Sequence, residues 1–326
     1  MKSLSAGDTP VTTTRGRARL GTAATGAFAL SLLASTSAFA VEGNLGEVNL
    51  QIDPTITVGA SMRVSPRDCV NVGTGNGGCG WRSDNQDNGN LNFDRGDLIG
   101  ANVKAIADMS ATWENFGAFV RARAFYDLIY TNNRLRFRDL NHDAQQRLNS
   151  NVDILDAYAY WNSEVADMPF SLRVGNMVQN WGESLFIRNG INQFVSLDVA
   201  SIRQAGSEVK EALQPMPMVY GSLGVTGLLT LEGFWQFGHS FTEPDPAGSF
   251  FQVDDLIGPG ALPLILAGPD APNGTALPPY PLAIYQTDDR NESNPLSQFG
   301  LSARYYATWL NQGTDLGLYY VHYNSR

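Results

Sequence analysis

Residues 50–64 read LQIDPTITVGASMRV, and apolar side chains or proline occupy every even position from Leu50 to Val64. The odd positions carry polar or small side chains, among them Gln51, Asp53 and Arg63. Successive side chains of a β-strand point to opposite faces, so this stretch predicts a strand with one apolar and one polar face.

The same alternation recurs along the chain. In 99–113 the apolar stripe begins at Ile99, and in 116–130 it ends at Tyr130. The polar faces of these two stretches carry Lys104, Asp108, Arg121, Arg123 and Asp127. Together with the first stretch, the pattern predicts nine strands, at 50–64, 99–113, 116–130, 152–162, 170–178, 216–225, 228–241, 298–310 and 315–324.

Short and long connections alternate between these strands. Those at 114–115, 163–169, 226–227 and 311–314 are short, and those at 65–97, 131–151, 179–215 and 242–297 are long. This asymmetry is typical of an all-β, transmembrane antiparallel up-and-down β-barrel with long external loops, in which about 9–11 residues cross the membrane. A secreted β-sandwich or β-solenoid is the alternative. Because single-chain bacterial barrels close with an even number of strands, nine strands predict that 41–326 is the N-terminal portion of a larger barrel.

The first 40 residues have the features of a cleaved signal peptide. Lys2, Arg15 and Arg19 belong to a basic start, an apolar stretch follows at 20–34, and Ala38-Phe39-Ala40 ends it. A basic region, an apolar region and a small-residue cleavage site define such a peptide, so we predict cleavage after residue 40. The alternative is a buried N-terminal helix. Export and the barrel pattern together predict the outer membrane of a Gram-negative bacterium.

Composition narrows the class of protein further. The formal net charge of −10 argues against a nucleic-acid partner, because binding to phosphates needs clustered lysine and arginine. The chain after residue 40 has no run of roughly 18 apolar residues, which excludes a helical membrane protein. Cys69 and Cys79 lie in one predicted loop of an exported chain, so we expect a disulfide between them, with two free thiols as the alternative.

No arrangement of residues indicates catalysis. His142, His239 and His322 are scattered and have no partner at the spacing of metal ligands. The nucleophile-elbow pattern of the hydrolases is absent. We therefore expect a protein that is not an enzyme and that has no cofactor and no metal site.

Several stretches resemble a known family when they are taken together. They are LNFDRGDL at 91–98, GAFVRARAFYD at 117–127, DAYAY at 156–160, LRVGNMVQNWGESLFIRNGIN at 172–192, KEALQPMPMVYGSLGV at 210–225 and LEGFWQF at 231–237. The chain resembles the proteobacterial outer-membrane family catalogued as domain of unknown function 1302. The resemblance implies an association with envelope systems that handle hydrophobic compounds, alongside a periplasmic carrier and an inner-membrane pump.

The long connection at 179–215 is the strongest candidate for a functional site. A long loop that follows a barrel strand can fold inward and narrow the interior. We expect Asp198 to cap a short helix within this connection, and Trp181 and Glu183 to face a passing solute. The structural alternative is that Trp181 and Glu183 attach the connection to Arg121 or Arg123. The predicted residues of the interior are Lys104, Asp108, Arg121, Arg123, Asp127, Trp181 and Glu183.

Three functions fit these expectations. The first is a conduit or binding protein for small hydrophobic, lipid-like solutes, in contact with outer-membrane lipid. The second is a general porin for polar solutes. The third is a non-conducting structural or assembly component of the envelope.

Overall fold

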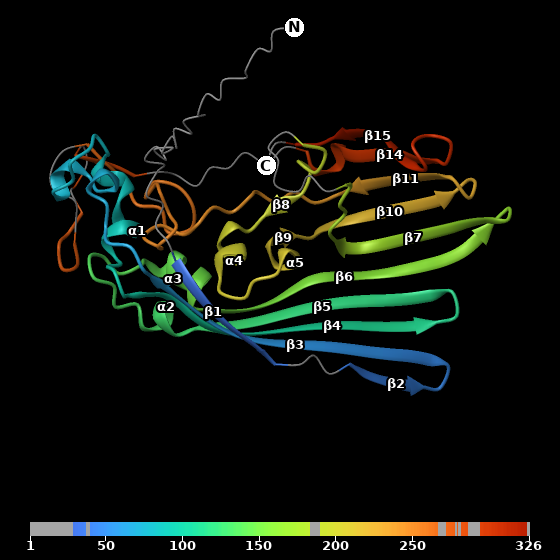
Figure 1. Ribbon diagram of the computed structural model, residues 1–326, viewed down its shortest axis with the longest axis horizontal. Coiled ribbons are helices and arrows are strands. Elements are labelled where there is room, and N and C mark those ends of the chain that lie inside the picture. Colours follow the sequence, from blue (N-terminus) through green and yellow to red (C-terminus); the bar gives the residue numbers. More distant parts are fainter. Residues whose placement is uncertain are drawn as a thin grey trace, which may run out of the picture.

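One large antiparallel β-sheet makes up most of the structure (Figure 1). The computed structural model describes residues 29–36, 40–182, 190–266, 272–277, 279, 282–285 and 294–324. The sheet has 11 strands in the order β1-β3-β4-β5-β6-β7-β10-β11-β14-β15, with β2 paired to β3 beside β1. The all-β class predicted from the alternation is therefore confirmed.

The boundaries of the elements are as follows. The strands of the large sheet are β1 (Ala29–Thr36), β2 (Val41–Leu45), β3 (Val48–Arg63), β4 (Leu98–Trp113), β5 (Phe116–Asp127), β6 (Ser150–Val165), β7 (Met168–Met177), β10 (Met216–Gly224), β11 (Leu229–Gln236), β14 (Gln298–Ala307) and β15 (Thr314–His322). Short pairs outside it are β8 (Ser196–Leu197) with β9 (Leu213–Gln214), and β12 (Leu264–Ile265) with β13 (Ala283–Ile284). The α-helices are α1 (Asn88–Leu91), α2 (Leu128–Asn132), α3 (His142–Asn149), α4 (Val199–Arg203) and α5 (Val209–Ala212). In the described ranges, no helix is both long enough and apolar enough to span a membrane.

Each of the nine predicted strands corresponds to one strand of the large sheet, and β1 and β2 are additional. Both pair with β3, β2 along Val48–Ile52 and β1 along Ile56–Arg63. β1 falls within the predicted signal peptide, of which residues 1–28 and 37–39 lie outside the described residues. β15 ends the order on the other side, and no pairing among the described strands joins it to β1, β2 or β3.

The connections are sorted between the two ends of the sheet (Figure 1). The turns that join β4 to β5, β6 to β7, β10 to β11 and β14 to β15 lie at one end, and the long connections with α1, α2 and α3 lie at the other. Ala166 and Asp167 form the turn between β6 and β7, with φ angles of 53° and 63°. Two successive residues with positive φ match a type I′ hairpin turn, whose twist suits paired strands.

The charged residues of the large sheet from β3 to β15 lie on one face. The register places Asp53 opposite Asp108, Asp108 opposite Arg121, and Arg123 opposite Asp153. Along the sheet, the register brings the other Asp, Glu, Lys and Arg residues of these strands to the same face, namely Arg63, Lys104, Asp127, Asp156, Glu164, Arg173, Glu232, Arg304 and Asp315. We call this the inner face and the opposite one the outer face.

The outer face is apolar and exposed. Val152 is 79% exposed and Leu318 is 76% exposed, whereas Lys104 on the inner face is only 1% exposed. A sheet in a water-soluble protein commonly packs its apolar face on the core and leaves its polar face to water. This sheet has the opposite arrangement of side chains.

The prediction of one continuous strand over 116–130 is wrong at its end. β5 stops at Asp127, because the Asp127 carboxylate accepts hydrogen bonds from the amides of Ile129 (2.8 Å) and Tyr130 (3.3 Å) and so begins α2. Tyr130 consequently leaves the outer face. Its side chain is 6% exposed, and its hydroxyl donates to the carbonyl of Ile99 at 2.9 Å.

The apolar stripe predicted to begin at Ile99 is also displaced at its first residue. The register between β3 and β4 shifts between Ser61 and Met62, so Leu98 lies opposite Met62 and Gly100 lies opposite Ser61. This bulge turns Ile99 inward, where it is 4% exposed, and leaves Leu98 44% exposed. An extra residue in one strand reverses the face of the side chains before it.

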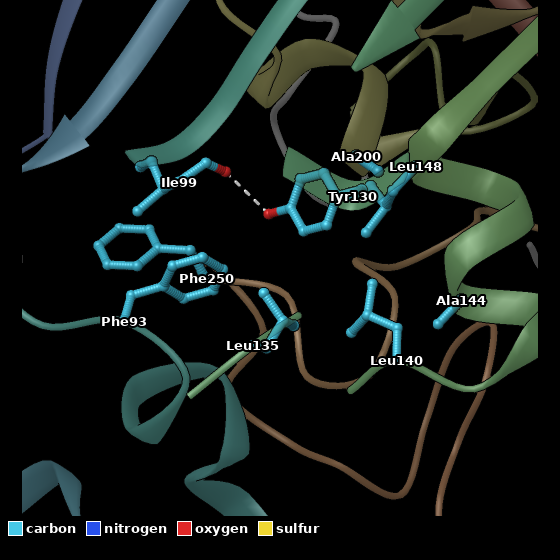
Figure 2. Close-up of a cluster of buried hydrophobic side chains, with 9 residues drawn as sticks. All are labelled: Phe93, Ile99, Tyr130, Leu135, Leu140, Ala144, Leu148, Ala200 and Phe250. Carbon is cyan, nitrogen blue, oxygen red and sulfur yellow. Dashed lines mark hydrogen bonds between the residues drawn. The ribbon is translucent and has the colours of Figure 1, made fainter. Parts of the chain in front are cut away.

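A compact hydrophobic cluster covers the long-connection end of the sheet (Figure 2). It draws residues from four separate connections and from β4, and its members are Phe93, Ile99, Tyr130, Leu135, Leu140, Ala144, Leu148, Ala200 and Phe250. Phe93 and Phe250 pack edge to face with ring centroids 5.8 Å apart. These connections are therefore packed together and do not extend separately from the strands.

A disulfide closes a small ring in the connection between β3 and β4. Cys69 and Cys79 are bonded, with their Cα atoms 5.2 Å apart. Two carboxylates from outside the ring fix the glycine-rich chain that forms it. The Gly73 amide donates to Asp87 at 2.7 Å, and the Gly75 amide donates to Asp84 at 2.9 Å. Side chains, and not a bound phosphate, satisfy these amides.

Phe93→Ala is expected to loosen the cluster of Figure 2 by about 3–5 kcal/mol, because a buried aromatic side chain leaves a cavity. Hydrogen exchange measured by mass spectrometry should show faster exchange of the amides in 88–99 and 128–148. The control is Val253→Ala, since Val253 lies in the same region but is 64% exposed. Equal exchange in the two variants would contradict the role assigned to the cluster.

Candidate functional site

Part of the connection between β7 and β10 lies against the inner face (Figure 1). Residues 190–215, here called the inner segment, contain β8, α4, α5 and β9. The helix predicted after Asp198 is confirmed as α4, and the Asp198 carboxylate accepts a hydrogen bond from the Ser201 amide at 3.1 Å. β8 pairs with β9, which closes the inner segment into a loop. The segment therefore occupies the position expected for an inward-folded connection.

The inner segment approaches β3 at a glycine. A Cβ atom placed on Gly59 would lie 2.7 Å from the Cβ of Ala205 and 3.0 Å from its carbonyl oxygen. Only a residue without a side chain allows this close approach of two backbones. Gly59 thus provides one of the contacts that seat the segment on the sheet.

A fully buried ion pair fastens α5 to β4. Lys104 Nζ donates to Glu211 Oε1 at 2.6 Å and to the Gly206 carbonyl at 3.0 Å. The exposed fractions of the two side chains are 1% and 0%. Glu211 Oε1 also accepts from the Glu208 amide at 2.7 Å, so the same oxygen completes the first turn of α5. Loss of either ion would leave the other charge buried without its partner.

Arg123 connects the inner segment to β5 and β6. One guanidinium nitrogen donates to the Ser201 hydroxyl at 2.8 Å and to the Glu211 carbonyl at 3.4 Å. The other donates to Asp153 Oδ2 at 2.6 Å. Because Arg123 is 4% exposed, these charge-assisted hydrogen bonds lie inside the protein.

Arg121 and Asp108 form the centre of a second charged group. The guanidinium contacts both carboxylate oxygens of Asp108, at 2.7 and 2.8 Å, and Asp156 at 3.1 Å. Lys210 of α5 lies 3.8 Å from Asp108 and 3.1 Å from Glu208. The bidentate contact fixes the orientation of the arginine on the inner face.

Trp181 lies apart from these charged residues. Its indole packs against Phe194, Phe234 and Tyr319, with ring centroids 5.7, 5.0 and 5.8 Å away, and its Nε1 donates to Glu232 at 2.7 Å. Trp181 is 1% exposed, so its ring is covered by protein and contacts neither Arg121 nor Arg123. The ring instead attaches the start of the connection to β11 and β15.

Asp127, another predicted residue of the interior, lies at the end of β5. Asp127 is 4% exposed, caps α2 and accepts a hydrogen bond from the Ala101 amide at 3.1 Å. Its contacts are therefore those of a structural residue at the end of β5. Glu183 lies outside the described residues.

Two hollows lie beside the inner segment. The larger, of about 620 Å³, lies between the start of β6, α3 and the inner segment, and its lining includes Arg123, Asp153, Arg147, Glu211 and Leu213. The smaller, of about 350 Å³, is lined by Phe119, Arg121, Asp156, Tyr158, Arg173, Met177, Val178, Lys210 and Leu213. The second hollow combines aromatic and apolar side chains with cationic ones, which is a lining able to hold an organic solute.

Several acidic groups line the larger hollow, and three of them, Asp153, Asp198 and Glu211, are engaged in ion pairs. Arg147 lies 3.1 Å from Asp198, and Arg203 lies 2.6 Å from Asp245 at the far side of α4. Burial raises the pKa of the Asp245 carboxyl above its ordinary value, although Arg203 acts to lower it. Within the described ranges, no three His, Cys, Asp or Glu side chains gather in a way that could hold a metal ion.

Arg173, Phe119 and Tyr158 are residues of the inner face that were not predicted from the sequence. All three lie on the inner face, since Phe119 pairs with Tyr158 and Arg173 pairs with Tyr160 across neighbouring strands. Extending the alternation into 170–178 places Arg173 on the face opposite Leu172 and Val174, and this signal could have found it. The bulge between Val120 and Ala122 hides the corresponding pattern in β6, because it shifts the register within that strand.

Glu211→Ala is expected to release the inner segment, because it leaves the Lys104 ammonium buried without a carboxylate, at a cost of about 3–5 kcal/mol. Trypsin should then cleave faster after Arg203 and Lys210. The double variant Lys104→Met with Glu211→Leu removes both charges and should recover much of the protection. Glu208→Ala is the matched control, since Glu208 is 46% exposed and its loss removes a helix cap, worth about 1 kcal/mol, and an exposed ion pair with Lys210, worth at most about 1 kcal/mol. Equal cleavage of the Glu211 and Glu208 variants would contradict this role of the ion pair.

Comparison with known proteins gives one match. The model of the family described as "Protein of unknown function (DUF1302)" matches residues 21–326, nearly the whole chain. No curated protein and no solved structure matches the chain. The stretches that resemble this family include much of β5 and the end of β7, as well as Lys210 and Leu213, which all contribute to the lining of the smaller hollow. The chain is therefore a member of the DUF1302 family.

Proposed function

We propose that this protein forms part of the wall of an outer-membrane β-barrel and that the barrel is a conduit or binding protein for small hydrophobic solutes. The observation that carries the proposal is the distribution of charge on the large sheet from β3 to β15. The Asp, Glu, Lys and Arg residues of these strands lie on the inner face, and the exposed outer face is apolar. Such a sheet suits lipid on its outer side and a polar interior on the other.

The energetic argument concerns individual positions on the outer face. A lysine or arginine facing lipid near the middle of a bilayer costs about 2–4 kcal/mol. Adjacent residues of β4 show that apolar and charged side chains lie on different faces, since Val103 is 48% exposed and Lys104 is 1% exposed. In β6, Val152 is 79% exposed while Asp153 pairs with Arg123 on the inner face. Lipid contact explains why apolar side chains occupy the exposed positions.

The arrangement of the ends supports the same proposal. Short turns at one end and packed, longer connections at the other are typical of outer-membrane barrels, whose periplasmic turns are short. A signal peptide over residues 1–40 would deliver the chain to the periplasm. Its removal would also take away β1 and leave Ile56–Arg63 on β3 available to another strand.

The chemistry of the interior favours a hydrophobic solute over a purely polar one. The smaller hollow is lined by Phe119, Tyr158, Met177 and Val178 as well as by charged side chains. Aromatic and aliphatic walls combined with placed polar groups are typical of sites for small organic ligands, and here the charged groups are Arg121, Asp156, Arg173 and Lys210. The resemblance to DUF1302 proteins supports partners of the same kind, namely a periplasmic carrier and an inner-membrane pump.

Leu301→Arg tests whether the outer face contacts lipid. Leu301 lies near the middle of β14 and is 59% exposed. In a bilayer this substitution should lower the free energy of unfolding by about 2–4 kcal/mol, whereas on a face exposed to water it should change it by less than about 0.5 kcal/mol. Denaturant unfolding of protein folded into lipid vesicles measures the difference. Val253→Arg, at a 64% exposed position of a connection, is the control that should be neutral. Neutral results for both variants would contradict the membrane proposal.

Uptake by cells separates the three candidate functions. Cells of a Gram-negative bacterium that express the protein should take up the neutral hydrophobic dye phenylnaphthylamine faster than cells without it. They should hydrolyse nitrocefin, a polar substrate cleaved in the periplasm, at an unchanged rate. Faster uptake of both compounds would favour the general porin. Unchanged uptake of both, with normal assembly in the outer membrane, would favour the structural or assembly component.

A further inference from the structure

The smaller hollow contains one arginine that has no acidic partner among the described residues. Arg121 is engaged with Asp108 and Asp156, and Lys210 lies beside Asp108 and Glu208. Arg173, in contrast, makes no ion pair and no hydrogen bond with any other described residue. Its side chain is exposed on the inner face of β7. An anion entering the hollow would therefore meet a cation that is not already neutralised.

Two tyrosine rings hold this arginine in place. The Arg173 guanidinium carbon lies 5.9 Å from the centroid of the Tyr158 ring and 5.5 Å from that of Tyr220. A cation against aromatic faces is stabilised while the N–H groups at the edge of the guanidinium remain available as donors. The five donors of an arginine match the geometry of a carboxylate, sulfonate or phosphate group. The site is thus prepared to accept an oxyanion.

Apolar groups line much of the hollow, beside the paired side chains of Arg121, Asp156 and Lys210. The rings of Phe119 and Tyr158 lie 5.3 Å apart, and Met177 and Val178 contribute aliphatic surface. A volume of about 350 Å³ accommodates a small organic molecule. The cation and the apolar walls belong to the same hollow, so one ligand with an anionic end and a hydrophobic body can contact both.

We infer that this hollow binds anionic amphiphiles, with the oxyanion on Arg173 and the hydrophobic body against Phe119, Tyr158, Met177 and Val178. The inference rests on the proposed function, because it places the ligand in the interior of the barrel. It adds the chemical class of the solute, which is a single molecule carrying one acidic group on an aliphatic or aromatic body. A neutral solute of the same shape should bind more weakly.

Two fluorescent dyes that differ mainly in one acidic group test this inference. Anilinonaphthalene sulfonate carries a sulfonate, and phenylnaphthylamine has a similar ring system without charge. Energy transfer from tryptophan to each dye is measured with the protein in nanodiscs of neutral lipid, and nanodiscs without protein serve as the blank. The wild-type protein should bind the sulfonate dye more tightly, and added salt should reduce this preference.

Arg173→Gln should weaken binding of the sulfonate dye by about tenfold, the loss expected for one hydrogen bond to a charged group. Its affinity for the neutral dye should stay within about twofold of the wild-type affinity, because Arg173 does not contribute to the apolar walls of the hollow. Arg173→Lys keeps the charge and should retain a preference for the anion. Arg304→Gln is the matched control, since Arg304 shares the inner face but has Glu232 as a partner at 3.7 Å. Arg304→Gln should leave the affinity for both dyes unchanged.

The outcomes separate this inference from the function on which it rests. The anionic site would be overturned if the wild-type protein bound the two dyes with equal affinity. It would also be overturned if the Arg173 and Arg304 variants lost affinity for the sulfonate dye to the same extent. Neither result would contradict a conduit for hydrophobic solutes. Failure to bind either dye would count against both proposals. Circular dichroism of each variant shows whether the β-structure is retained.

Discussion

Side chains of a β-strand alternate between two faces, and in this sheet the charged groups from β3 to β15 share one of them. Those charges cannot be buried alone, so the chain must supply partners for them on that face. Neighbouring strands supply some, as Asp108 does for Arg121. The inner segment supplies others, as Glu211 does for Lys104. The placement of the segment thus follows from the charge pattern of the strands.

The apolar groups of the protein are divided between two environments. One set packs in the clusters at the long-connection end and around Trp181, where aromatic rings cover one another. The other set remains exposed on the outer face, as Leu318 does at 76%. Burial in the clusters orders the connections and the start of the inner segment, and the exposed set supports the proposed contact with lipid.

Much of the sheet could be predicted from the sequence, because a period of two residues is visible in each strand. The pattern fails where a local event interrupts it. The carboxylate of Asp127 ends β5 by capping a helix, and a bulge turns Ile99 inward. The site was harder to predict. The alternation places Lys104 on the inner face, but it does not identify Glu211, 107 residues further along the chain, as its partner. The role of Trp181 depends on rings from β11 and β15, which no local pattern identifies.

The fastening of the inner segment has a thermodynamic consequence. The contacts of Lys104 and Arg123 with the segment are ionic or hydrogen-bonded, whereas Phe194, Val195 and Leu213 of the same segment are held by apolar packing. If the segment moves away, water can solvate the freed ions, and this hydration recovers part of what the contacts contributed. The apolar side chains of the inner segment gain no such compensation, because their exposure to water is unfavourable. The polar contacts of the inner segment can therefore break and form again at a smaller cost in free energy than its apolar contacts.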